Sequence, residues 1–217
     1  MNLKVTKTVV VKLLYQMMYD IHRIACDNDI KYWTYGGTTL GAVRNRGLIP
    51  WDDDLDIGTM QLDLKKFLGL EVHLQRCGYS IVKTWFGYKV CLSQRSNIPE
   101  CEWSYPFLDI FPFTTHTNKL VLARKQARAL WPNAWYNISD TETLELFPFG
   151  DFHVFVPANA DAYCDRMYGE DWRTHGYRVY DHEKEMHVKV QKVRLREQDK
   201  QPAEPTRVIR RRCVGGF

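Results

Sequence analysis

Hydrophobic positions in the first third of the chain follow helical spacing in two segments and strand-like spacing between them. Apolar residues recur every three or four positions over residues 6–27, and residues 62–76 read as a second helix. Residues 31–35 form a short strand-like run, and residues 55–58 resemble a strand that enters a core. The pattern predicts helices that pack on a sheet.

The second half of the chain continues this mixture. Strands are predicted at 79–85 and 88–92, joined across Gly87 as a hairpin, and residues 147–157 read as a turn and strand. Residues 120–130 are predicted to be a helix with a solvated basic face.

The last segment has a different composition. From about residue 194 the chain combines charge, Gln and Pro with Arg210-Arg211-Arg212 and shows no periodicity. We therefore expect one folded domain over residues 1–193 and a basic, flexible tail over residues 194–217.

Composition agrees with a single packed domain. The 217 residues are 45% hydrophobic, and the formal net charge of +4 is too small to indicate a nucleic-acid binder. Trp85, Trp103, Trp131 and Trp135 suit either a carbohydrate platform or ordinary packing, so none is assigned to a site.

The most informative polar pattern is the run Pro50 to Gly58, PWDDDLDIG. In an extended chain alternate side chains share a face, so Asp52, Asp54 and Asp56 would converge while Asp53 points away. Oxygen-rich clusters of this kind suit Mg²⁺ or Mn²⁺. An acidic surface turn is the alternative, but the apolar residues on both sides of the run favour a metal site for phosphate chemistry.

A second pattern lies upstream of the aspartates. The predicted strand 31–35 is followed by Gly36-Gly37-Thr38-Thr39 and then by a plausible helix start over residues 40–44. Backbone amides at such a turn can bind an anion, and glycine allows a phosphate to approach closely. A simple tight turn is the alternative interpretation.

The histidines and cysteines suggest no further site. His182 and His187 are spaced to hold a metal, but a polar surface segment is the preferred interpretation. The six cysteines show no zinc spacing and are expected to be reduced, structural thiols. No signal peptide or membrane span is recognised, so a cytoplasmic location is expected.

Together these motifs resemble a known family. The stretch TYGGTTLGAVRNRGLIPWDDDLDIG, residues 34–58, is similar to the signature of the LicD family, which includes bacterial phosphocholine transferases and the fukutin and fukutin-related proteins. Residues 107–112, 154–157 and 168–172 resemble later parts of the same family. The resemblance covers about residues 10–175 and places the chain in the nucleotidyltransferase (DNA polymerase β-like) superfamily.

The resemblance implies an α/β (α+β) fold with a mixed β-sheet flanked by helices. It also implies transfer of a phospho-alcohol, such as phosphocholine or phosphoribitol, from a CDP-linked donor to a sugar hydroxyl of a glycan, with release of CMP. By position, Asp54, Asp56 and Asp109 would be catalytic and would bind Mg²⁺ or Mn²⁺ together with Asp52. The donor phosphates would be held by five further residues, Gly36, Gly37, Thr38, Arg44 and Arg46.

Two other functions remain open at this stage. The same motifs serve a nucleotidyltransferase that attaches NMP from an NTP to a small molecule or protein. A non-catalytic glycan-binding protein with the same fold is the third possibility. Retention of the glycine pair and of all the site aspartates speaks against a decayed enzyme.

Overall fold

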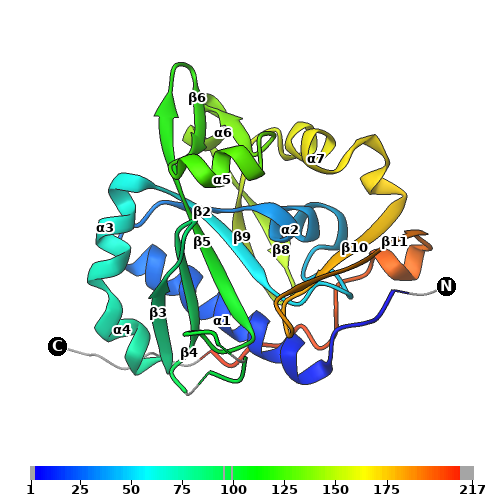
Figure 1. Ribbon diagram of the computed structural model, residues 1–217, viewed down its shortest axis with the longest axis horizontal. Helices are drawn as coiled ribbons and strands as arrows, with labels where there is room; N and C mark the ends of the chain where they lie inside the picture. The colour runs from blue at the N-terminus through cyan, green and yellow to red at the C-terminus, as the bar shows by residue number, and fades with distance from the viewer. Residues whose placement is uncertain (1–2, 95, 99, 211–217) are drawn as a thin grey trace.

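A mixed sheet forms the centre of the molecule. The computed structural model describes residues 3–94, 96–98 and 100–210, and within them a seven-stranded sheet runs in the order β1-β2-β5-β4-β3, with β6 paired to β5 and β7 paired to β6 (Figure 1). β2 and β5 are parallel, and the other pairings described in this sheet are antiparallel. The strands are β1 Tyr32–Thr34, β2 Leu55–Met60, β3 Tyr79–Lys83, β4 Tyr88–Leu92, β5 Phe107–His116, β6 Lys119–Leu122 and β7 Trp135–Asn137.

One face of the sheet is covered by the long first helix. In α1 (Thr8–Asp27) the apolar positions with helical spacing are buried, and they pack in one core with Leu55 and Ile57 of β2 and with Leu108 of β5. The helices α3 (Gln61–Gly69) and α4 (Glu71–Arg76) contribute Phe67 and Leu74 to the same core. The predicted helix over 6–27 is therefore confirmed.

The opposite face carries a second core made largely of aromatic rings. Phe111 and Phe113 of β5 pack there with Tyr35 and with Tyr163 and Trp172 from the later part of the chain. The elements around this core are α2 Gly36–Leu40, the π-helix η1 Gly41–Asn45, α5 Lys125–Leu130, α6 Ile138–Glu142, α7 Ala160–Tyr168 and the 3-10 helix η2 Glu170–Arg173. The α/β fold with a mixed sheet flanked by helices is thus as predicted.

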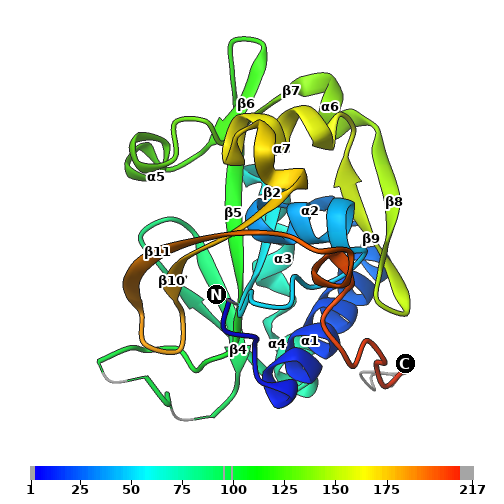
Figure 2. The same cartoon turned by 90° about the vertical axis from the view of Figure 1, so that its right-hand side faces the viewer.

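Two separate hairpins complete the domain. β8 (Leu144–Phe149) pairs with β9 (Phe152–Pro157), and β10 (His175–Asp181) pairs with β11 (Met186–Arg194). Figure 2 shows the β10–β11 hairpin reaching toward the loop that joins β4 to β5. Trp103 Nε1 in that loop donates to Glu185 Oε1 at 3.3 Å, so the turn of the hairpin is held beside the sheet.

Several predicted elements differ in the structure. The segment 62–76 is two helices divided at Leu70, directly after Gly69, because glycine is a poor helix former. The prediction of a helix over 120–130 is wrong for its first part, which is β6. Leu120 and Leu122 alternate with less buried residues and pack as a strand, a distinction that a short apolar run does not reveal. The helix after the glycine pair begins at Gly36 itself.

The end of the chain packs on the domain as far as residue 210, which differs from the expected flexible tail. Ala203 N donates to Leu48 O at 2.8 Å, and Asn45 Nδ2 donates to the carbonyl oxygens of Asp199 and Gln201 at 3.2 and 3.0 Å. These backbone contacts need no hydrophobic periodicity, so the sequence pattern did not indicate them. Residues 211–217 lie outside the described residues, and the boundary at residue 194 stays a prediction.

The cysteines follow the expectation only in part. Cys26, Cys91, Cys101 and Cys164 carry free thiols, as predicted. The prediction is wrong for Cys77, which is disulfide-bonded. Sequence spacing does not show which sulfur atoms meet in space. Cys213 lies outside the described residues.

None of the helices in the described part of the chain combines the length and the apolar character needed to cross a bilayer.

Candidate active site

Three charged side chains form a row across neighbouring strands of the sheet. Asp56 of β2 lies opposite Asp109 of β5 in parallel register, and Asp109 lies opposite Lys89 of β4 in antiparallel register. Lys89 Nζ donates to both Asp109 oxygens, at 2.8 and 3.0 Å, and both residues are buried. Lys89 was missed by the sequence analysis, although a lysine within the apolar strand 88–92 is itself a signal.

Asp54, Asp56 and Asp109 form a compact carboxylate cluster. One carboxylate oxygen of each residue lies within 4.8 Å of one from each of the others. Burial raises the pKa of all three carboxyl groups, to about 7 for Asp109 although Lys89 opposes the rise, and well above the usual range for Asp56. Buried carboxylates at this spacing repel one another unless a cation joins them.

The donor chemistry of this cluster fits a hard divalent cation. All three groups offer carboxylate oxygens, which Mg²⁺ and Mn²⁺ prefer, and no sulfur ligand is present in the set. Lys89 and His182 supply positive charge beside Asp109 and Asp54, whereas Asp56 accepts a hydrogen bond from the backbone amide of Gly37 at 3.2 Å and has no ion pair within the described part of the chain. The residues present therefore leave negative charge for a metal to neutralise.

The glycine pair shapes the helix that faces this cluster. Gly36 has φ +54°, and a Cβ atom there would collide with the Asp56 carboxylate. The Gly36 amide donates to Tyr163 Oη at 3.0 Å, and the Asp56 amide donates to Thr38 Oγ1 at 2.7 Å. These contacts tie α2 to α7 and to β2. The amides of Gly36 and Gly37 already have partners within the protein, so their predicted contact with donor phosphates stays a prediction.

Asp52 and Asp53 lie on either side of the predicted cluster. A Cβ atom on Gly37 would be 2.5 Å from Asp52 Oδ2, so Asp52 lies directly over the start of α2. Burial, followed by the charges of Asp54 and Asp53, raises the Asp52 pKa to about 8. The structure brings together two candidate metal groups, Asp54 with Asp56 and Asp109, and Asp53 with Asp54 and His182, and Asp52 is outside both. Side chains alternate strictly between the two faces of the sheet only from Leu55 onward, where β2 begins, so alternation does not place Asp52.

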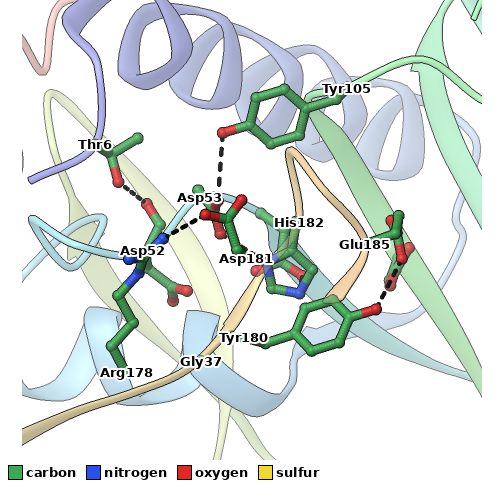
Figure 3. Close-up of polar contacts among 12 residues, drawn as sticks. Thr6, Gly37, Asp52, Asp53, Tyr105, Arg178, Tyr180, Asp181, His182 and Glu185 are labelled. Atoms are coloured by element: carbon green, nitrogen blue, oxygen red, sulfur yellow. Dashed lines mark hydrogen bonds and ion pairs between the residues drawn. The ribbon is translucent and has the colours of Figure 1, made fainter. Parts of the chain in front are cut away.

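Asp53 and Asp54 contact a residue from the far end of the domain. His182, in the turn of the β10–β11 hairpin, places Nδ1 2.6 Å from Asp53 Oδ1 (Figure 3). Its Nε2 lies 3.2 Å from Asp54 Oδ2. Burial lowers the His182 pKa, but the charges of Asp54 and Asp53 outweigh this and raise it to about 10. The interpretation of this histidine as part of a polar surface segment is wrong, whereas His187 is exposed.

The two arginines predicted to contact the donor have different environments. Arg44 Nη1 donates to the carbonyl oxygens of Trp172 and His175 at 2.8 and 3.4 Å, and its guanidinium lies over the Trp51 ring. Burial lowers the Arg44 pKa to about 10. Arg46 is exposed and has φ +57°, directly after the π-helix.

A cavity of about 420 Å³ opens beside Asp52 and Asp53. Its wall includes Asp52, Asp53, Gly37 and Arg44 from the first half of the chain, and it continues along η2 and β10. The remaining lining includes five large aromatic residues, Trp51, Tyr168, Trp172, Tyr177 and Tyr180. None of the four tryptophans considered for a carbohydrate platform is among the residues that line it.

The mixed sheet and the carboxylate row across β2 and β5 define a nucleotidyltransferase-like domain. The profile of the LicD/FKTN/FKRP nucleotidyltransferase domain matches residues 29–159. The chain belongs to this family, as the sequence motifs indicated. His182 lies beyond the matched residues.

Related proteins support this assignment without adding a substrate. An uncharacterized protein of Rickettsia prowazekii is 36% identical over 157 residues, which are 72% of this chain and 54% of the relative. A Rickettsia typhi protein is 34% identical over 72% of this chain and 46% of its own length. The chain thus spans about half the length of these relatives. Lipopolysaccharide cholinephosphotransferase LicD of Haemophilus influenzae is 44% identical over 39 residues, 18% of this chain and 15% of that protein.

Solved structures give only a distant overlap. The crystal structure of ANT(2")-Ia in complex with adenylyl-2"-tobramycin has a TM-score of 0.43 at 15% identity, covering 73% of this chain and 80% of that chain. A solution structure of the antibiotic-resistance factor ANT(2'')-Ia has a TM-score of 0.40, also at 15% identity, covering 75% and 77%. Overlaps this distant add nothing to the assignment.

Proposed function

We propose that this protein is a metal-dependent phosphotransferase that moves a phospho-alcohol from a CDP-linked donor to a sugar hydroxyl of a glycan. The observation that carries the proposal is the buried group of Asp54, Asp56 and Asp109 within a LicD-family domain. The neighbouring aspartates Asp52 and Asp53 line a cavity with several aromatic rings in its wall. The cholinephosphotransferase name of the Haemophilus influenzae relative supports phosphocholine-like chemistry. The donor and acceptor remain proposals, because the chain covers only part of its relatives.

The proposed metal ligands are the carboxylates of Asp54, Asp56 and Asp109. Asp52 is the fourth predicted ligand, and it lies over Gly37, outside the group of three. A divalent cation bound there supplies positive charge for the non-bridging phosphoryl oxygens and for the departing nucleotide phosphate.

The reaction would be an in-line displacement. The acceptor hydroxyl oxygen forms a bond to the phosphorus that carries the alcohol, and the bond from that phosphorus to the bridging oxygen breaks. CMP leaves with the electron pair, and the hydroxyl proton passes to a carboxylate or to solvent. The aromatic walls of the cavity suit a sugar ring or a nucleoside, and the buried carboxylates hold the reacting end.

Asp109 has two proposed roles, and its contacts favour one of them. Its raised pKa, about 7, suits a group that accepts the acceptor's proton. However, both of its oxygens already accept hydrogen bonds from Lys89, which favours a fixed ligand over a base. An Asp109→Asn variant with full turnover and intact metal dependence would remove Asp109 from the site.

The proposal is tested by product analysis with a panel of donors. The full chain is incubated with CDP-choline, CDP-ribitol, ATP or CTP, each with Mn²⁺, Mg²⁺ or EDTA, together with a mixture of glycan acceptors. We expect CMP release from a CDP-alcohol with Mn²⁺ or Mg²⁺, none with EDTA, and none in Asp56→Asn. Asp27→Asn, at an exposed position in α1, is the matched control and should behave as wild type.

The products separate the three functions. Transfer of the alcohol phosphate with CMP release supports the proposal. Attachment of the nucleotide with release of pyrophosphate would instead identify a nucleotidyltransferase. The absence of any reaction and of any stabilisation by nucleotide or metal would favour a non-catalytic glycan-binding protein.

A further inference from the structure

The turn of the β10–β11 hairpin reaches the aspartate loop through one side chain. Both ring nitrogens of His182 face carboxylates. Nδ1 lies 2.6 Å from Asp53 (Figure 3), and Nε2 lies 3.2 Å from Asp54. Each ring nitrogen therefore lies within hydrogen-bond distance of a carboxylate oxygen. The side chain of His182 is 22% exposed, and those of Asp53 and Asp54 are 13% and 9% exposed, so these bonds are largely shielded from water.

The surroundings fix the ring in this orientation. The imidazole packs edge-on against Phe107 and lies 4.8 Å from the Tyr180 ring, measured between centroids. Tyr105 Oη donates to the second Asp53 oxygen at 3.4 Å, and Tyr180 Oη donates to Glu185 Oε2 at 3.1 Å. Asp53 is therefore held from two sides and in turn holds the histidine.

We propose that His182 is a positioning residue that orients the Asp54 carboxylate for the divalent cation. This inference rests on the metal site of the proposed function. The Asp53 carboxylate holds one ring nitrogen, so the other ring nitrogen is fixed facing Asp54. The hydrogen-bond partners of metal-binding carboxylates commonly set ligand orientation, and their loss typically weakens metal affinity about 10- to 100-fold.

The arrangement assigns different tasks to neighbouring aspartates. Asp54 serves the metal, while Asp53 anchors the histidine that holds Asp54. The element that supplies His182 lies outside the residues matched by the family profile, which end at 159. The hairpin is therefore part of the active site of this chain and not only a wall of the cavity.

The test measures Mn²⁺ binding to the full chain, and electron paramagnetic resonance quantifies the free ion. His182→Gln removes a positive charge, so electrostatics alone would tighten Mn²⁺ binding. Positioning predicts the opposite, a dissociation constant at least about tenfold higher. His187→Gln, on the exposed part of the same hairpin, should bind Mn²⁺ as wild type does.

A double variant removes the remaining ambiguity of charge and folding. Asp53→Asn/His182→Gln leaves the net charge unchanged and leaves no unpaired carboxylate at position 53. We expect it to bind Mn²⁺ about as weakly as His182→Gln, because both residues act through one hydrogen-bonded path. Thermal midpoints and near-ultraviolet circular dichroism establish whether each variant is folded. If His182→Gln is not folded, the Mn²⁺ affinity of the double variant tests the inference instead.

The outcomes distinguish this inference from the proposed function. Wild-type protein that binds Mn²⁺, with equal or tighter binding in the folded histidine variants, would overturn the role of His182 alone. Wild-type protein that binds no Mn²⁺ would overturn the metal site and both proposals. Weaker binding in His182→Gln and the double variant, but not in His187→Gln, supports the inference.

Discussion

Lys89 and Asp109 face each other across β4 and β5 as a buried ion pair, with the ammonium group within 3.0 Å of both carboxylate oxygens. The Lys89 ammonium also lies 3.3 Å from the centroid of the Phe107 ring. A lysine in such a position is costly to bury without its partner. The pair therefore links the stability of the sheet to the carboxylate group proposed to bind metal.

Replacing Lys89 with methionine should destabilise the metal-free protein strongly. The variant leaves Asp109 buried without its cation, and breaking a buried pair in this way costs about 3–5 kcal/mol. Because Lys89 lowers the Asp109 pKa, its loss should raise that pKa above the present value of about 7. Asp109 then takes up a proton in the folded state, so the cost should be small near pH 5 and grow as the pH rises toward 8.

The measurement is urea unfolding of wild type and Lys89→Met at several pH values, with EDTA or Mn²⁺. Mn²⁺ should recover part of the lost stability, since it replaces the missing charge. Lys66→Met breaks an exposed pair with Asp63 and should cost less than about 0.5 kcal/mol at any pH. Equal costs for the two variants would show that the buried pair is not specially stabilising.

The aspartates that follow strand geometry could be placed from sequence. Asp56 and Asp109 lie in regular strands, and their opposition in the sheet follows from the family pattern. Asp53 and Asp54 precede the strand, where alternation does not apply, so the contacts of Asp53 were not foreseeable. His182 is 128 residues from Asp54 in sequence, and only tertiary packing brings them together. No local sequence pattern predicts such a contact. The helix α1, in contrast, could be predicted from the periodicity of its own residues.

Gly37→Ala should disturb the site while leaving the fold intact. The new methyl group would lie 2.5 Å from Asp52 Oδ2, the end of a side chain that can move, and alanine favours a helix over glycine by about 1 kcal/mol. We expect a thermal midpoint near that of wild type but a loss of about tenfold or more in metal-dependent CMP release. Gly69→Ala is the control, because nothing lies within 4 Å of its added Cβ atom. Full activity of Gly37→Ala would show that the position of Asp52 is unimportant.

Arg44→Lys should be costly although it keeps the charge. The Arg44 guanidinium donates to two carbonyl oxygens and to Asn45 Oδ1 at 2.9 Å, an arrangement that a lysine ammonium does not reproduce. Leaving buried carbonyl oxygens without donors costs about 1–3 kcal/mol. We expect a lower midpoint in urea for Arg44→Lys and no change for Arg46→Lys, its exposed neighbour. An unchanged midpoint in Arg44→Lys would mean that its contacts do not stabilise the domain.

His22 should make the protein less stable as the pH falls below neutrality. His22 lies in α1, and its Nδ1 is 2.6 Å from Oη of Tyr32 in β1. Burial, followed by electrostatic repulsion from His153 and Arg23, lowers the His22 pKa below 6.5. The unfolded chain, with an ordinary histidine pKa near 6.5, then binds more protons than the folded chain, so stability falls as the pH drops through about 6.5. This penalty is absent in His22→Asn, which keeps a polar group near the Tyr32 hydroxyl.

The difference between wild type and His22→Asn is the quantity to measure, because other groups of the protein titrate equally in both. We expect His22→Asn to be less stable than wild type at pH 7.5 and the gap to narrow or reverse at pH 5.0, as followed by urea unfolding. His73→Asn, in the exposed part of α4, controls for the loss of an imidazole at the surface. A gap that stays constant or widens toward pH 5.0 would show that His22 is not held in its neutral form by burial.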